Sequence, residues 1–179
     1  DEGADAEGRE DGVRELPMTE GQRQLWIESQ MGEEGSRAYI ESLSIRLHGA
    51  LDVAALRGAL QTLSDRHDAL RTTLVPGGET QRIHPSLPVE VPLTDLRGAA
   101  PGEVRTWVRE TARRPFDLER GPLVRFALAA LADDEHLLVF DSHHAILDGG
   151  SVTVLLRELG ELYAARAEGR AAALPPPPD

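Results

Sequence analysis

The chain has 179 residues, of which 40% are hydrophobic, enough for one folded domain with a core. Its 31 acidic and 19 basic residues give a net charge of −12, which argues against a basic nucleic-acid-binding face. Cysteine is absent, which excludes disulfides and thiolate chemistry, and no stretch approaches the ~20 apolar residues of a membrane span. The acidic N-terminus does not resemble a signal peptide, so we expect a cytoplasmic protein without nucleic-acid or membrane partners.

Both ends of the chain have the composition of linkers. Residues 1–15 are acidic, contain glycine and have few large apolar side chains, which predicts a linker or disordered tail. Residues 171–179 end in a proline run that cannot continue a helix and is typical of a semi-rigid linker. The folded domain is therefore expected over residues 16–170, as a piece of a longer chain.

The first half of this domain predicts a helix, a strand and a second helix. Thr19 is the expected N-cap of the first helix, with Gln22 at the capping-box position. Alternating apolar residues over Tyr39–His48 predict a strand. Asp52 is the expected cap of the second helix, whose apolar residues recur at helical spacing: Val53, Leu56, Leu60 and Leu63.

The second half alternates again between strands and helices. Proline and glycine at positions 76–78 predict a hairpin turn, and Pro92 confines its short strand to a sheet edge. The expected strands are Leu70–Val75, Thr80–Ile83, Val89–Leu93, Leu123–Leu131 and His136–Ser142, and the expected helices are Pro101–Arg114 and Ser151–Glu168, the latter starting as early as Gly149. The fold class is therefore α/β, a sheet with helices packed on it.

The stretch FDSHHAILDGGSV, Phe140–Val152, places two histidines at the end of a predicted strand. Successive side chains of a strand point to opposite faces, so His143 and His144 are expected to have different surroundings. This alternation argues against a metal site built on the pair. The other histidines show no ligand spacing either, so no metal site is predicted; they are His48, His67, His84 and His136.

The same stretch fits an acyl-transfer site. A neutral His144 can accept a proton, and the first N–H groups of the following helix can stabilise an oxyanion nearby. Asp148 has two interpretations: it orients a histidine as a triad acid does, or it pairs with an arginine and holds the loop. Ser142 lies on the strand rather than in a nucleophile elbow, which favours direct transfer over an acyl-enzyme. The alternative is that this stretch has no chemical role and is only a strand end, a turn and a helix cap.

Four strings resemble, in the same order, the motifs of condensation domains of nonribosomal peptide synthetases. HHAILDG resembles the signature HHxxxDG of that family, and RHDALRTTL resembles RHexLRTxF, with Leu74 where an aromatic is usual. The four strings are MTEGQRQLWIESQ (18–30), RHDALRTTL (66–74), PFDLERGPLVR (115–125) and HHAILDG (143–149). Together they are far more specific than any one of them.

The resemblance covers about residues 16–167 and implies a two-lobed, chloramphenicol-acetyltransferase-like fold. This chain matches the N-terminal lobe, an α+β two-layer sandwich in which helices pack on a mixed sheet. Nothing in it resembles the second lobe, so residues 171–179 are expected to lead into a missing C-terminal lobe. The fragment alone is expected to be inactive.

The implied reaction is amide formation between an upstream acyl thioester and the amine of a downstream aminoacyl group. No cofactor is expected to bind directly, because 4′-phosphopantetheine arms of donor and acceptor carrier proteins present both substrates. The lobe's other implied partner is its own C-terminal lobe.

The resemblance also assigns roles to the residues of the signature. His144 would accept or position the proton of the amine, and His143 would be mainly structural. Asp148 would pair with an arginine, for which Arg66 and Arg71 are the candidates. Gly149 would let the phosphopantetheine arm pass close to the backbone.

Other interpretations share part of this pattern. Epimerization domains and wax-ester-synthase-like acyltransferases also carry HHxxxDG, although the GQRQLW and RHDALRT strings favour condensation. Heterocyclization domains are excluded because they have aspartates in place of the histidines. An isolated lobe that binds a carrier protein without catalysis is the alternative from a different class.

Overall fold

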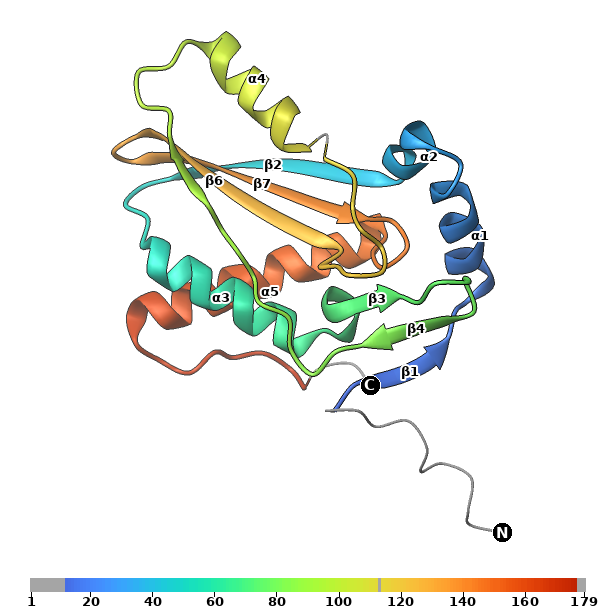
Figure 1. Cartoon of the computed structure of the whole chain (residues 1–179). Coiled ribbons are helices and arrows are strands. Elements are labelled where there is room, and N and C mark those ends of the chain that lie inside the picture. Colours follow the sequence, from blue (N-terminus) through green and yellow to red (C-terminus); the bar gives the residue numbers. More distant parts are fainter. Residues whose placement is uncertain (1–11, 113, 177–179) are drawn as a thin grey trace.

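The computed structural model describes residues 12–112 and 114–176, which form two sheets and five α-helices within these ranges (Figure 1). In chain order the elements are β1 (Arg14–Pro17), α1 (Glu20–Ser29), α2 (Glu33–Ala38), β2 (Ile40–His48), α3 (Val53–Arg66), the 3₁₀ helix η1 (Asp68–Arg71), β3 (Thr72–Leu74), β4 (Thr80–Ile83), β5 (Leu93–Asp95), α4 (Pro101–Ala112), β6 (Val124–Ala132), β7 (Glu135–His143) and α5 (Gly149–Glu168).

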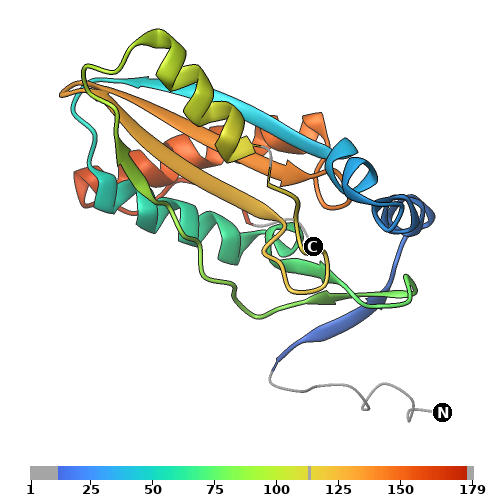
Figure 2. The ribbon, with the colours of Figure 1, turned by 45° about the horizontal axis from the view of Figure 1, so that its top comes forward.

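The larger sheet has the strand order β2-β7-β6-β5. Strand β7 pairs antiparallel with both of its neighbours, and β5 pairs parallel with β6. Helices α3 and α5 lie side by side on one face of this sheet, and α4 crosses the opposite face (Figures 1 and 2). The predicted α/β class, with helices packed on a mixed sheet, is therefore confirmed.

The main core lies between this sheet and the helix pair. Phe126 of β6 stacks on Phe140 of β7 with 5.1 Å between ring centroids, as their opposite positions in the register require. The helices contribute leucines at helical spacing, all of them buried: Leu56, Leu60 and Leu63 of α3, and Leu155, Leu159 and Leu162 of α5. The apolar periodicity predicted from the sequence is thus the face that these two helices bury.

A buried ion cluster ties α3 to α5. Glu158 of α5 lies 2.9 Å from Nε of Arg66 and 2.8 Å from Nε2 of His67. Burial alone would raise the pKa of Glu158, but the hydrogen bonds from His67 and Arg66 outweigh burial and leave this pKa lowered. The cluster therefore keeps a carboxylate charged inside the helix pair.

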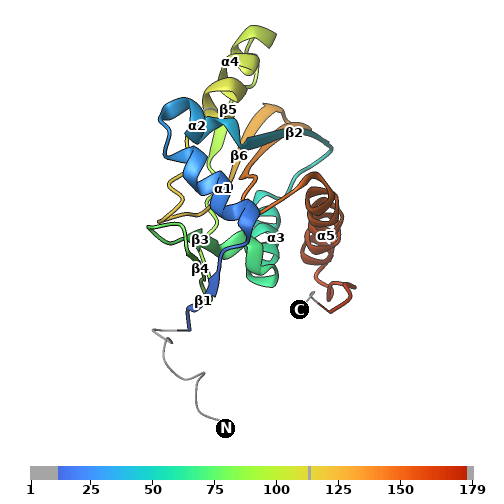
Figure 3. The same cartoon turned by 90° about the vertical axis from the view of Figure 1, so that its right-hand side faces the viewer.

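The smaller sheet, of strand order β1-β4-β3, lies beside α1 at one end of the molecule (Figures 1 and 3). Strands β3 and β4 form the predicted hairpin. Its turn requires glycine at Gly78, because φ is +71° and a Cβ there would lie 2.6 Å from the Trp26 ring of α1. The absence of a side chain at Gly78 therefore lets the hairpin turn pack closely against Trp26 of α1.

Four elements differ from the sequence prediction. The predicted strand Leu70–Val75 begins at Thr72, because Asp68–Arg71 form the 3₁₀ helix η1. Strand β1 begins at Arg14, so Arg14 and Glu15, which were assigned to the tail, pair with β4. Strand β5 starts at Leu93, where the predicted edge strand ends, because residues 84–92 run as irregular chain before the parallel pairing with β6 begins. Helix α2 was not predicted. The rest of the predicted tail, residues 1–11, lies outside the described residues.

The segment after α5 folds back onto the helix pair. Leu174 packs against the main core, the N–H of Ala173 donates to Glu161 at 2.7 Å, and Arg66 donates to the carbonyl of Pro175. The described part of the predicted linker, residues 171–176, therefore contacts the domain. Among the described residues, no helix is long and apolar enough to cross a membrane.

Candidate functional site

The two histidines lie at the end of β7, where the strand gives way to a turn. His143 is the last residue of the β2–β7 ladder and faces Ile40. The N–H of His144 donates to the carbonyl of Tyr39 at 2.8 Å, and the N–H of Ile146 donates to the carbonyl of His143 at 3.1 Å. The backbone on both sides of His144 is therefore fixed.

The side chain of His143 is fully buried. It lies between the rings of Tyr39 and Phe116, and its Nδ1 accepts the N–H of Ala145 at 3.2 Å. Burial, together with the positive charge of a protonated His144, lowers the pKa of His143 to about 4. His143 is therefore neutral at physiological pH, with its proton on Nε2.

The side chain of His144 is 43% exposed, and its Nδ1 lies 3.1 Å from Oε1 of Glu41 on β2. Among the described residues, Nε2 of His144 has no hydrogen-bond partner. The two histidines have different surroundings, as predicted, but for another reason: β7 ends at the buried His143, and His144 begins the turn with its ring partly exposed.

Asp148 is the N-cap of α5. Its carboxylate accepts the N–H of Ser151 at 2.8 Å and the Ser151 hydroxyl at 2.7 Å. These hydrogen bonds, the backbone one first, lower the pKa of Asp148, and the nearby His144 contributes a smaller electrostatic effect. The N–H of Ser151, near the start of α5, is therefore committed to Asp148 and is not available to an oxyanion.

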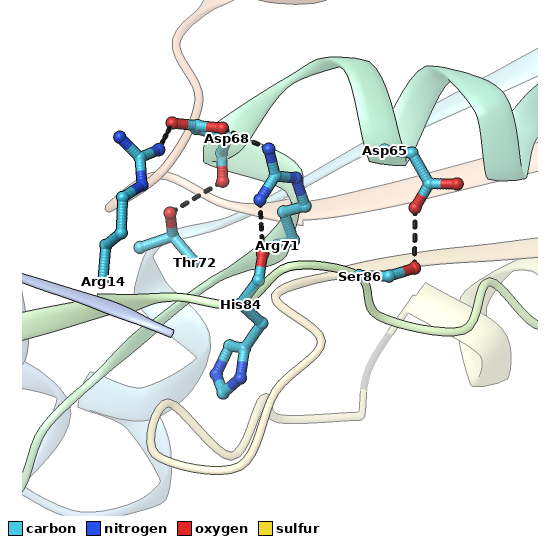
Figure 4. Close-up of polar contacts among 7 residues, drawn as sticks. All are labelled: Arg14, Asp65, Asp68, Arg71, Thr72, His84 and Ser86. Atoms are coloured by element: carbon cyan, nitrogen blue, oxygen red, sulfur yellow. Dashed lines mark hydrogen bonds and ion pairs between the residues drawn. The ribbon is translucent and has the colours of Figure 1, made fainter. Parts of the chain in front are cut away.

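The expected pairing of Asp148 with Arg66 or Arg71 is wrong. Arg66 pairs with Glu158, ten residues along α5 and thus about 15 Å from its N-terminus. Arg71 pairs with Asp68 and donates to the carbonyl of His84, and Asp68 also pairs with Arg14 (Figure 4). Arg66 therefore links α3 to α5, and Arg71 links η1 to the chain at His84.

The capping role of Asp148 predicts different outcomes for two substitutions. Asp148→Ala removes the acceptor for Ser151 and is expected to lower the melting temperature by about 2–4 °C. Asp148→Asn keeps a capping oxygen and should lower it by much less, since Asn is as good an N-cap as Asp. Thermal denaturation of both variants checks this, and equal losses would indicate that the charge, not the cap, matters.

Gly149 opens α5 directly after this cap. A Cβ at Gly149 would meet no other atom within 4 Å, so the backbone faces open space. This openness is compatible with a ligand that passes close to the chain.

The other motif strings surround the turn at residues 144–146. The side-chain amide of Gln22 accepts the N–H of Thr19 at 2.9 Å, as the predicted capping box requires. It also donates to the carbonyl of Ala145 at 3.2 Å and to Gln81 at 2.9 Å. Helix α1 is therefore linked directly to the histidine turn.

A second apolar cluster supports the same turn. Ala145 packs there with residues from three of the strings: Trp26 and Leu25 from α1, Leu74 from β3, and Phe116 and Leu118 from the segment before β6. The four strings therefore converge at the end of β7, which could not be inferred from their spacing in the chain.

Two site contacts were not predicted from the sequence. Glu41 belongs to none of the motif strings, and Gln22 was assigned only a capping role. The signal for Glu41 lies in the β2–β7 register, which pairs residues about 100 positions apart. Among the described residues, no group of three His, Cys, Asp or Glu side chains is placed to hold a metal ion.

Two solved structures are similar to this chain over most of its length. The X-domain of teicoplanin biosynthesis, in its complex with OxyB, has a TM-score of 0.82 and 33% identity, and the match covers 94% of this chain and 36% of that chain. The starter condensation domain of the rhizomide synthetase RzmA has a TM-score of 0.83 at 24% identity, and the match covers 90% of this chain and 40% of that chain. At this low identity, the similarity is evidence for a shared fold only.

The sequence comparisons identify the family. Residues 13–179 match the family model of the condensation domain. Malpinin synthetase of Mortierella alpina is 39% identical over 166 residues, which cover 90% of this chain and 2% of that protein. Phosphinothricin tripeptide synthetase PhsC of Streptomyces viridochromogenes is 39% identical over 170 residues, covering 91% of this chain and 16% of that protein. The chain belongs to the condensation-domain family and spans a small part of these relatives.

Proposed function

We propose that this chain is the N-terminal lobe of a condensation domain that joins an upstream acyl thioester to the amine of a downstream aminoacyl group. One observation carries the proposal. In a chain of this family, the second histidine of the signature is held at the end of β7 with its side chain 43% exposed and its Nε2 without a partner among the described residues.

The reaction needs one nucleophilic attack and one proton transfer. The amine nitrogen attacks the thioester carbonyl, the new C–N bond forms and the C–S bond breaks. His144 accepts the proton that the amine loses, and the departing sulfur takes it up as a thiol. A thioester is already activated, so positioning and modest base catalysis are sufficient.

The other signature residues support this turn. The Ala145 N–H fixes the buried His143 ring, Asp148 caps α5, and Gly149 leaves open space for a 4′-phosphopantetheine arm. Donor and acceptor carrier proteins are the proposed partners. The chain spans 36% to 40% of the solved relatives described above, so a C-terminal lobe is proposed to complete the site.

A binding role without catalysis is the second candidate. The observation in its favour is the 33% identity to the X-domain, which was solved in complex with OxyB. Under this proposal the lobe would serve as a docking surface, and His144 would have no chemical role.

Reconstitution with two loaded carrier proteins tests the proposal. The complete domain, with its C-terminal lobe, is expected to form an amide when the acyl-loaded donor and aminoacyl-loaded acceptor are both present. It should form none when either carrier is left unloaded, and the isolated lobe should be inactive. Carrier binding without amide formation would support the second candidate, and exchange of the α-proton in place of condensation would indicate an epimerization domain.

A further inference from the structure

We propose that Glu41 is a positioning residue for His144: its carboxylate holds Nδ1 of the imidazole and leaves Nε2 to accept the proton. This inference rests on the function proposed above and assigns to Glu41 the orienting role that the sequence offered to Asp148. The observation behind it is the 3.1 Å separation between Nδ1 of His144 and Oε1 of Glu41.

The register of β2 and β7 brings these two side chains together. Glu41 faces Ser142, and His144 follows Ser142 by two residues. Side chains at positions two apart point to the same face of a strand, and diagonal neighbours across a ladder lie within reach of long side chains. His144 is the first residue of the turn after β7, so the strand pairing brings the turn beside Glu41 and the hydrogen bond to Tyr39 holds it there.

The backbone of His144 is fixed from the same side. Its N–H donates to the carbonyl of Tyr39, two residues before Glu41 in the chain. His144 is thus held at its backbone by Tyr39, just before β2, and contacted at Nδ1 by Glu41, near the start of β2.

Among the described residues, Glu41 is the carboxylate that contacts the His144 ring. Asp148, the acid of the signature, instead accepts the N–H and hydroxyl of Ser151 at Oδ1. Among the described residues, His144 is the partner recorded for the carboxylate of Glu41. Because a carboxylate stabilises a proton on the nearest ring nitrogen, the neutral imidazole should carry its proton on Nδ1.

This tautomer decides which nitrogen can act as a base. With the proton on Nδ1, the lone pair resides on Nε2, the nitrogen that has no partner among the described residues. A charge that develops on the ring during proton transfer would also be stabilised by Glu41. Loss of Glu41 should therefore slow the chemical step without weakening substrate binding.

Steady-state kinetics of the complete domain test the role of Glu41. Glu41→Ala is expected to lower kcat about tenfold, a part of the 10²–10⁴-fold that a general base contributes, with KM unchanged. Glu41→Gln keeps an oxygen facing Nδ1 and should lose less. Glu34→Gln, at an exposed carboxylate of α2, removes the same charge and should leave kcat unchanged. A wild-type kcat for Glu41→Ala would overturn the inference.

The tautomer of His144 gives a second readout that does not depend on activity. Nitrogen chemical shifts of the imidazole in this chain should report the proton on Nδ1, and Glu41→Ala should move the population toward Nε2. If His144→Ala retains full activity while the nitrogen shifts respond to Glu41, the proposed base role of His144 fails and the contact stands. If His144→Ala is inactive and Glu41→Ala changes neither kcat nor the shifts, the role of Glu41 fails alone.

Discussion

His144→Ala in the complete domain is expected to lower kcat by about 10²–10⁴-fold, the range that a positioned general base contributes. The substitution removes the nitrogen that accepts the proton of the amine. Because the side chain is 43% exposed and lies outside the apolar clusters, the melting temperature should hardly change. Amide formation from loaded carriers, followed with and without the variant, measures the loss.

A matched substitution at another histidine tests whether the loss of kcat is specific to position 144. His48→Ala removes an exposed histidine at the far end of β2 and should leave kcat at the wild-type value. Some rate should persist in His144→Ala, because positioning of the two substrates does not require the base. Full activity of His144→Ala would remove the assigned role of this residue.

Acidification from pH 6.5 to pH 4 is expected to cost the chain about 3 kcal/mol of folding free energy through His143 alone. Burial lowers the pKa of His143 to about 4 in the folded state, whereas an unfolded chain titrates near the ordinary histidine value of 6.5. Between these values the unfolded state binds more protons than the folded state, so stability falls as the pH falls. Below about pH 4 both states are protonated and this contribution stops changing.

Denaturant unfolding at a series of pH values measures this loss. His143→Phe keeps an aromatic ring between Tyr39 and Phe116 but cannot be protonated, so its stability should fall much less over the same interval. His48→Ala removes an exposed histidine and should follow the wild-type curve. Parallel curves for the wild type and His143→Phe would mean that His143 is not the titrating group.

Local signals in the sequence located most of the fold. Thr19 and Asp52 cap the helices for which they were predicted, because a cap depends on residues three positions away. Asp148 caps α5 by the same rule, yet its position in a functional signature suggested a partner arginine. Strand β5 was misplaced because its start is set by parallel pairing with a distant strand, for which the sequence carries no local signal.

The candidate site was predicted in part for a similar reason. Strand alternation, a local property, predicted different surroundings for His143 and His144. Which ring is buried depends instead on the packing around β7 and on the turn that begins at His144. The contact between Glu41 and His144 depends on the register of two strands about 100 residues apart, and the link from Gln22 to Ala145 spans a similar distance. Contacts of this kind are fixed by tertiary packing, so no spacing within the chain could reveal them.

The fold-back of residues 171–176 onto α3 and α5 bears on how such lobes are recombined between synthetases. A splice placed directly after α5, at Gly169, would discard the Leu174 packing, the Ala173 bond to Glu161 and the Pro175 carbonyl that Arg66 binds. It would also expose apolar surface that the segment now covers. A junction placed after Pro175 keeps all three contacts within the transferred lobe. The preferred junction for recombination therefore lies inside the proline run and not at the end of α5.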